Sequence, residues 1–209
     1  MNRRMMMAYI INHQSRLPIE YQEVEYIEST GIQYINTGVN TTNDIGTEMR
    51  FSYDSNTYYQ YAIGELTAGS SRFSPIFIDK DSPDKFLFTD TVAFQYNDYA
   101  NFDNSPHTVR FNYPNRNISF DNTLIKTTAD TFATSTGGNI YLFARNYDGV
   151  SHAALIKLYF CKLYNNDTLV RNFVPCYRKA DNVTGLYDLV NDVFYTNAGT
   201  GTFIKGNGV

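Results

Sequence analysis

The sequence predicts an all-β protein, a jelly-roll β-sandwich preceded by a short N-terminal arm. The chain holds 18 Tyr, 15 Phe and no Trp, and aromatic rings favour the pleated, half-buried surface of a strand. From Val24 onward apolar and polar residues alternate, with clusters of Gly, Pro, Asn and Asp between the alternating stretches, as expected of a sandwich. Apart from residues 2–12, no stretch of ten or more residues keeps apolar positions at helical spacing.

The length of 209 residues fits one β-sandwich, since such domains commonly reach about 200 to 250 residues as a single unit. Residues 1–18 are predicted to form the arm, either a short helix or an extended tail, and residues 19–209 the sandwich domain. No internal repeat is visible, so a solenoid or propeller is not expected.

The clearest strand is predicted at His107–Tyr113. Val109 and Phe111 point to one side there and Arg110 to the other, which is the pattern of a strand with one solvated face. The same alternation predicts strands at Thr47–Tyr53, Tyr59–Glu65, Lys85–Thr89, Val92–Tyr96 and Arg116–Phe120.

Two further segments are apolar on nearly both faces, namely Asn139–Arg145 and Ala153–Leu163. Such segments are typical of strands inside a sheet, where both neighbours and both faces are covered. We expect them to be central strands that contribute to the sandwich interior.

Composition excludes several partners. Only 18% of the residues are charged and the formal net charge is -4, with no basic block, so DNA and RNA are not expected partners. No apolar run approaches the roughly 18 residues of a membrane-spanning helix. The apolar stretch Met5–Ile11 is short for a signal peptide, and His13 follows in place of a small-residue cleavage site, so Sec export is not expected.

The chain has two cysteines, Cys161 and Cys176, and both lie in apolar alternating runs. In that setting a cysteine behaves as a small buried hydrophobic residue. Free thiols are favoured over a disulfide, which stays open as the alternative.

The middle of the chain resembles laminin-G-like domains, a branch of the concanavalin-A-like lectin and glucanase sandwiches. His107–Thr128 follows the order of a long strand and a short hairpin, with Asp121 and Asn122 at the turn, where Asn tolerates the left-handed conformation. Downstream, Asn139–Gly149 and Ala154–Phe173 are similar to the closing strands of that family.

The two ends of the domain, Leu17–Gly38 and Leu169–Gly206, resemble such domains encoded by phages, prophages and gut bacteria. This resemblance implies a non-enzymatic virion component, a capsid decoration or tail attachment module, assembled in the host bacterial cytoplasm. Arg3, Arg4, Met5, Met6 and Met7 would then anchor the arm on capsid or tail proteins, and display on a symmetric particle implies a homo-oligomer. The alternative is a glycan-binding domain on a bacterial surface.

A glycoside hydrolase is the third alternative, because sandwiches of this class include such enzymes. Their chemistry needs two carboxylates that flank the sugar bond. The nearest acidic triplet, Glu23, Glu25 and Glu28, breaks the alternate spacing that would place all three on one face. We therefore expect no enzymatic activity.

Neither a cofactor nor a metal is expected, because the three histidines are scattered without partners at metal-ligand spacing. A calcium site is the one candidate. Asp79, Asp81 and Asp84 supply three carboxylates in six residues, yet the segment lacks the glycine and distal Glu of a calcium loop. A solvated turn is the favoured interpretation.

Sugar binding is the generic use of such a fold, and it needs an aromatic platform and a few fixed polar groups. The candidates are Tyr58, Tyr59 and Tyr61, with Arg145 and Asn146 at the end of a predicted central strand. Packing in the core or across strands is the alternative role for each ring.

Overall fold

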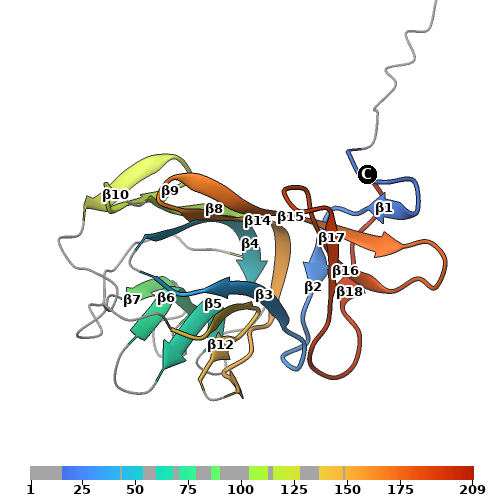
Figure 1. Cartoon of the computed structure of the whole chain (residues 1–209), viewed down its shortest axis with the longest axis horizontal. Helices are drawn as coiled ribbons and strands as arrows, with labels where there is room; N and C mark the ends of the chain where they lie inside the picture. Colours follow the sequence, from blue (N-terminus) through green and yellow to red (C-terminus); the bar gives the residue numbers. More distant parts are fainter. Residues whose placement is uncertain are drawn as a thin grey trace, which may run out of the picture.

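The computed structural model describes residues 16–42, 44–53, 60–67, 71–78, 86–89, 104–112, 115–127, 137–147 and 149–209. Within these ranges the protein is all-β, and two sheets pack face to face (Figure 1). The predicted fold class is thereby confirmed, since this arrangement is compatible with a jelly-roll β-sandwich. The described ranges contain no helix with the length and apolar character needed to cross a membrane.

The first sheet follows the order β10-β9-β8-β4-β14-β15-β16-β17, with β1 paired to β15 and β2 paired to both β14 and β18. Its strands are β1 Tyr21–Glu23, β2 Ile27–Glu28, β4 Ile45–Tyr53, β8 His107–Asn112, β9 Asn117–Phe120, β10 Thr123–Thr127, β14 Ile156–Asn165, β15 Thr168–Arg178, β16 Thr184–Asp188, β17 Val193–Thr196 and β18 Ile204–Lys205.

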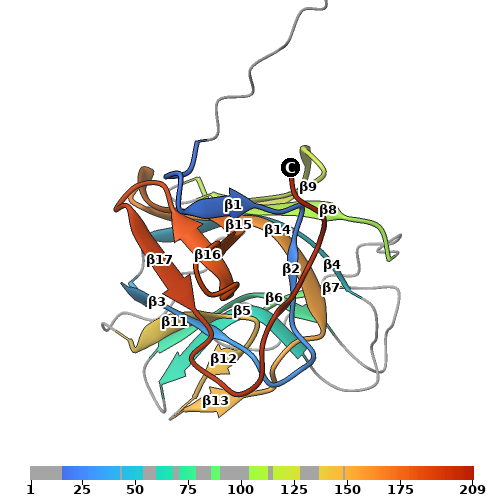
Figure 2. The same ribbon diagram turned by 90° about the vertical axis from the view of Figure 1, so that its right-hand side faces the viewer.

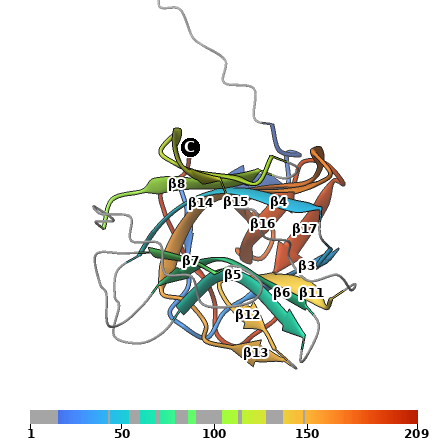
Figure 3. The same ribbon diagram turned by 90° about the vertical axis from the view of Figure 1, so that its left-hand side faces the viewer.

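The second sheet follows the order β13-β12-β5-β11-β3, and β6 and β7 extend it from β5. Its strands are β3 Ile35–Asn40, β5 Gln60–Thr67, β6 Ser71–Ile78, β7 Phe86–Thr89, β11 Asn139–Leu142, β12 Arg145–Asn146 and β13 Val150–Ser151. Figure 3 shows this sheet below the first one, with β12 and β13 at the edge farthest from β8.

Strands form where the alternation predicted them. In β8, Val109 and Phe111 are buried and Arg110 is exposed, because successive side chains point to opposite faces. The predicted strands at 47–53, 59–65, 85–89 and 116–120 correspond to β4, β5, β7 and β9. The strand predicted at Val92–Tyr96 lies outside the described residues.

The two segments predicted to be central do lie inside their sheets. β14 is paired to β4 on one side and to β15 and β2 on the other, and β11 lies between β5 and β3. The first segment is nevertheless not one continuous strand: Phe143 has a φ of 65°, which ends β11 before β12 begins at Arg145.

The core has two parts. The larger cluster lies between the sheets and includes Phe173, while a smaller one holds Leu17, Val174, Cys176 and Tyr187. Neighbouring residues in a strand point to opposite faces, so Phe173 faces the large cluster and Val174 faces away from it. The small cluster therefore lies on the other face of β15. Leu17, within the predicted arm, is only 6% exposed and covers that face.

The two cysteines are free and buried, as predicted. Cys161 belongs to the large cluster and Cys176 to the small one. They therefore lie on opposite faces of the first sheet, and each acts as a small apolar core residue.

The ends of the described chain meet at one side of the sandwich. Val209 donates its amide to the carbonyl of Glu23 over 3.1 Å, and Gly206 donates to Tyr26 over 2.9 Å. Figures 1 and 2 show the C-terminus beside β1, on the side away from β12 and β13. Arg16, the first described residue, donates a hydrogen bond to Glu23, so the first described residues lie next to the C-terminus.

Candidate functional site

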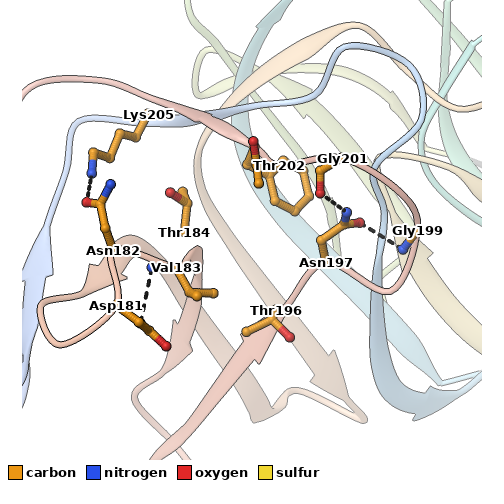
Figure 4. A pocket seen from close by; sticks show the side chains of 11 residues that line it. Asp181, Asn182, Val183, Thr184, Thr196, Asn197, Gly199, Gly201, Thr202 and Lys205 are labelled. Atoms are coloured by element: carbon orange, nitrogen blue, oxygen red, sulfur yellow. Dashed lines mark hydrogen bonds between the residues drawn. The ribbon is translucent and has the colours of Figure 1, made fainter.

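A polar cleft of about 560 Å³ opens between the β15–β16 turn, the loop after β17, and β18. Its walls are residues 181–184, residues of the segment 196–203, and Lys205. Figure 4 shows Lys205 and Asn182 on one side of the cleft and the Asn197–Gly201 loop on the other. All three segments belong to the continuously described C-terminal part of the chain.

The β15–β16 turn is closed by Asp181. Its carboxylate accepts two hydrogen bonds from the guanidinium of Arg178, at 3.1 and 2.6 Å, and one from the amide of Val183 at 3.2 Å. The bond from Arg178 lowers the pKa of Asp181. Asn182 follows with a φ of 60°, a conformation that Asn adopts more readily than most residues.

The opposite wall is shaped by Asn197. Its Oδ1 accepts hydrogen bonds from the amides of Tyr34 at 3.1 Å and Gly199 at 2.8 Å, and its Nδ2 donates to the carbonyls of Thr200 and Gly201. Because all four bonding positions of the amide are occupied, Asn197 positions the loop. Gly199 is required there, since a Cβ would lie 2.3 Å from the carbonyl oxygen of Ile32.

Lys205 carries the ammonium group of the cleft. Its Nζ donates a hydrogen bond to Oδ1 of Asn182 and lies 3.7 Å from the centre of the Tyr177 ring. Both partners are uncharged, and no carboxylate of the described residues lies within ion-pair distance of this ammonium. The group is thus held in place without being neutralised.

The lining also includes the apolar side chains of Val183 and Phe203 and three threonines, Thr184, Thr196 and Thr202. The threonine hydroxyls make no hydrogen bond with the rest of the described chain, whereas the neighbouring Asn197 is fully bonded. A hydroxyl offers one donor and two acceptor positions. The cleft therefore presents unused hydrogen-bonding capacity of both kinds.

The structure brings two of the sequence-predicted binding residues together. Nη1 of Arg145 donates to the hydroxyl of Tyr61 over 2.9 Å, and the guanidinium carbon lies 4.4 Å from the centre of the Tyr61 ring. Tyr61 is only 4% exposed, so its face is covered by Arg145 and is not open for a sugar to stack on. Asn146 points to the other side of β12 and donates to the carbonyl of Asn139.

The sequence reasoning missed two neighbours of Arg145. The ring of Tyr147 is 44% exposed and lies 5.5 Å from the guanidinium, and Nδ1 of His152 is 3.4 Å from Nη2. Partial burial and, to a smaller extent, the charge of Arg145 lower the pKa of His152. Tyr147 directly follows β12 and His152 directly follows β13, and no alternating pattern predicts this short hairpin.

The remaining predicted site residues lie outside the described ranges. They are Tyr58 and Tyr59, the calcium candidates Asp79, Asp81 and Asp84, and the arm residues Arg3, Arg4, Met5, Met6 and Met7. Among the residues that the structure does describe, no group of three or more His, Cys, Asp or Glu could hold a metal ion.

The sequence reasoning did not identify the cleft either. Its lining comes from two turns and a two-residue strand, built of Thr, Asn and Gly that are equally common in ordinary turns. In comparisons with known proteins, neither a family model nor a curated protein matches the chain.

Proposed function

We propose that the protein is a non-enzymatic binding module that holds a glycan in the cleft beside β18. The observation that carries this proposal is an open cleft lined by three threonine hydroxyls that no other group of the described chain occupies. Sugar hydroxyls need a small number of fixed donors and acceptors, and Thr184, Thr196 and Thr202 supply them. The laminin-G-like, concanavalin-A-like resemblance of the sequence supports the same function.

The acidic groups of the cleft favour binding over hydrolysis. Asp181 is the one carboxylate among the lining residues, and Arg178 holds it in its charged form. Glycoside hydrolysis needs a second carboxyl group that can donate a proton. Glu23 and Glu25 are not among the lining residues, and they bond Arg16 and Asn207.

The protein is further proposed to be a phage or prophage virion component, either a capsid decoration or a tail attachment module. This part rests on the resemblance of the two ends of the domain to phage-encoded domains. Support comes from the chain path, because Arg16, the first described residue, bonds Glu23 beside the C-terminus, on the side away from β12 and β13 (Figure 2). If the arm docks on capsid or tail proteins, the side of the sandwich that carries β12 and β13 faces outward from the particle.

Glycan binding is tested on an array of immobilised glycans with the full chain. We expect saturable binding that Thr184→Val and Thr202→Val each weaken, because valine keeps the shape and removes the hydroxyl. Thr123→Val on β10, an exposed threonine outside the cleft, is the matched control and should bind normally. Absence of saturable binding by the wild-type protein would refute the proposal.

Virion placement is tested by mass spectrometry of purified particles from the source strain or its induced prophage. A stoichiometric copy number in the particles supports the virion role. Recovery only in the cell-surface fraction would contradict it and favour the bacterial glycan-binding alternative.

A further inference from the structure

The charges of the cleft do not cancel. Asp181 is paired with Arg178, so these two residues contribute no net charge. Lys205 is held by the amide oxygen of Asn182 and by the ring of Tyr177, neither of which is an anion. The cleft therefore carries one uncompensated positive charge, at a fixed position.

The Lys205 ammonium is held in one position and still has N–H donors that a ligand can use. An ammonium has three N–H donors, and the Lys205 ammonium donates one hydrogen bond, to Asn182. The contact with the Tyr177 ring holds the side chain against the protein and makes the group partly buried. A cation that is partly removed from water and already ordered attracts an anion more strongly than a mobile surface lysine does.

We propose that the cleft accepts a saccharide that bears a carboxylate, such as a uronic acid residue, with the carboxylate on Lys205 and the ring hydroxyls on the threonines. This inference rests on the proposed glycan-binding function. One positive charge balances a monoanionic carboxylate, whereas a phosphate monoester carries a charge of about −1.5 to −2 at pH 7 and would leave excess negative charge in the cleft. The three hydroxyls favour a hydroxyl-rich ligand over an acidic peptide.

The test is calorimetric titration of the full chain with oligogalacturonate and with a neutral galactose oligosaccharide of equal length. We expect the acidic sugar to bind at least about tenfold more tightly, as one charge-assisted hydrogen bond allows. Lys205→Met should remove this preference, and Lys205→Arg should keep most of it. Lys162→Met makes the same change in net charge on β14, outside the cleft lining, and should keep the preference.

Three results would overturn the inference. If the neutral sugar binds as tightly as the acidic one, and Lys205→Met has no effect, the cleft binds glycans without charge selection and only this inference fails. If polyglutamate binds as well as oligogalacturonate, the ligand is an anion of any kind rather than a saccharide. If neither sugar binds the wild-type protein and the glycan array is also blank, the proposed function fails with it.

A measurement without variants guards against misfolding of Lys205→Met. Raising the salt concentration should weaken binding of the acidic sugar and leave any binding of the neutral sugar unchanged, because salt screens charge pairs. Binding of the acidic sugar that does not respond to salt would contradict a contact with Lys205.

Discussion

Asp188, at the end of β16, is a fully buried carboxylate with every oxygen in use. One oxygen accepts hydrogen bonds from the amides of Asn172 and Val190, at 2.9 and 3.0 Å. The other accepts from Asn191 at 2.7 Å and lies 3.6 Å from Nε of Arg171. This single side chain therefore ties the β16–β17 turn to β15.

Removal of the Asp188 carboxylate should destabilise the protein strongly. Asp188→Ala leaves the amides of Asn172 and Val190 without their acceptor. It also removes the carboxylate beside Arg171, which keeps its hydrogen bonds to the carbonyls of Thr37 and Val170. Breaking a buried ion pair in this way costs about 3 to 5 kcal/mol. Asp188→Asn should cost less, because an amide oxygen can still accept from the backbone. Urea unfolding measures both, with exposed Glu20→Ala as the control; equal stability of Asp188→Ala and wild type would contradict this assignment.

The buried thiols should be chemically inert in the folded protein. Burial raises the pKa of Cys161 and of Cys176 to about 12, so neither forms the reactive thiolate at pH 8 to 9, where an ordinary thiol ionises. We expect Ellman's reagent to titrate no thiol in the native protein and both thiols in urea. Rapid labelling of the native protein, or failure to label in urea, would contradict free, buried cysteines.

The alternating pattern could predict which residues of a strand are buried, but not what covers them. Val109 and Phe111 are buried as predicted, because every second side chain of a half-buried strand faces the core. Tyr61 was predicted as a platform for sugar, yet Arg145 lies over its ring. That contact joins residues from two strands far apart in the sequence, and a period of two carries no information about it.

At the scale of elements, the β9–β10 hairpin depends on two residues with positive φ. Asp121 has a φ of 45° and Asn122 a φ of 65°, the combination that a tight hairpin turn requires. The Asp121 carboxylate also accepts hydrogen bonds, from the Thr108 amide at 2.8 Å and from Nδ1 of His107 at 2.7 Å. Asn122 is therefore the position at which backbone strain can be tested alone.

Substitution at Asn122 should report this strain. Asn122→Val should lower the free energy of unfolding by roughly 1 to 2 kcal/mol, because a β-branched residue is disfavoured in the left-handed region. Asn122→Gly should leave stability unchanged or raise it. Thermal unfolding checks both variants against Leu124→Val, an exposed change on β10 outside the turn. If Asn122→Val is as stable as the wild-type protein, the turn adopts another conformation.

Strands were predictable at this scale, and the candidate site was not. The turn at Asp121 and Asn122 could be predicted because the required conformation restricts the residue type. The cleft is assembled from the turn at Asn182, the loop at Asn197 and the short β18. Turn and loop residues of this kind occur throughout the chain, so only the pairing of β18 with β2 reveals which of them meet.

At the scale of the whole molecule, the first and last parts of the domain complete one sheet. β1 pairs with β15, β2 pairs with β14, and β18 pairs with β2. Leu17 and Tyr21 cover the small core cluster on the outer side of β15. Both ends therefore contribute to closing the fold, and we expect it to unfold as one cooperative unit.

Deletion of residues 206–209 tests this closure while retaining Lys205. It removes three backbone hydrogen bonds, which involve Glu23, Glu25 and Tyr26, each worth about 0.5 to 1.5 kcal/mol. The melting temperature of a domain of this size should fall by roughly 5 to 15 °C, in a single calorimetric transition. Val209→Ser is the control, because its side chain is 77% exposed and its backbone bonds remain. If the deletion leaves the melting temperature unchanged, the C-terminal pairing is dispensable, and a second separate transition would mean that the ends form an independent unit.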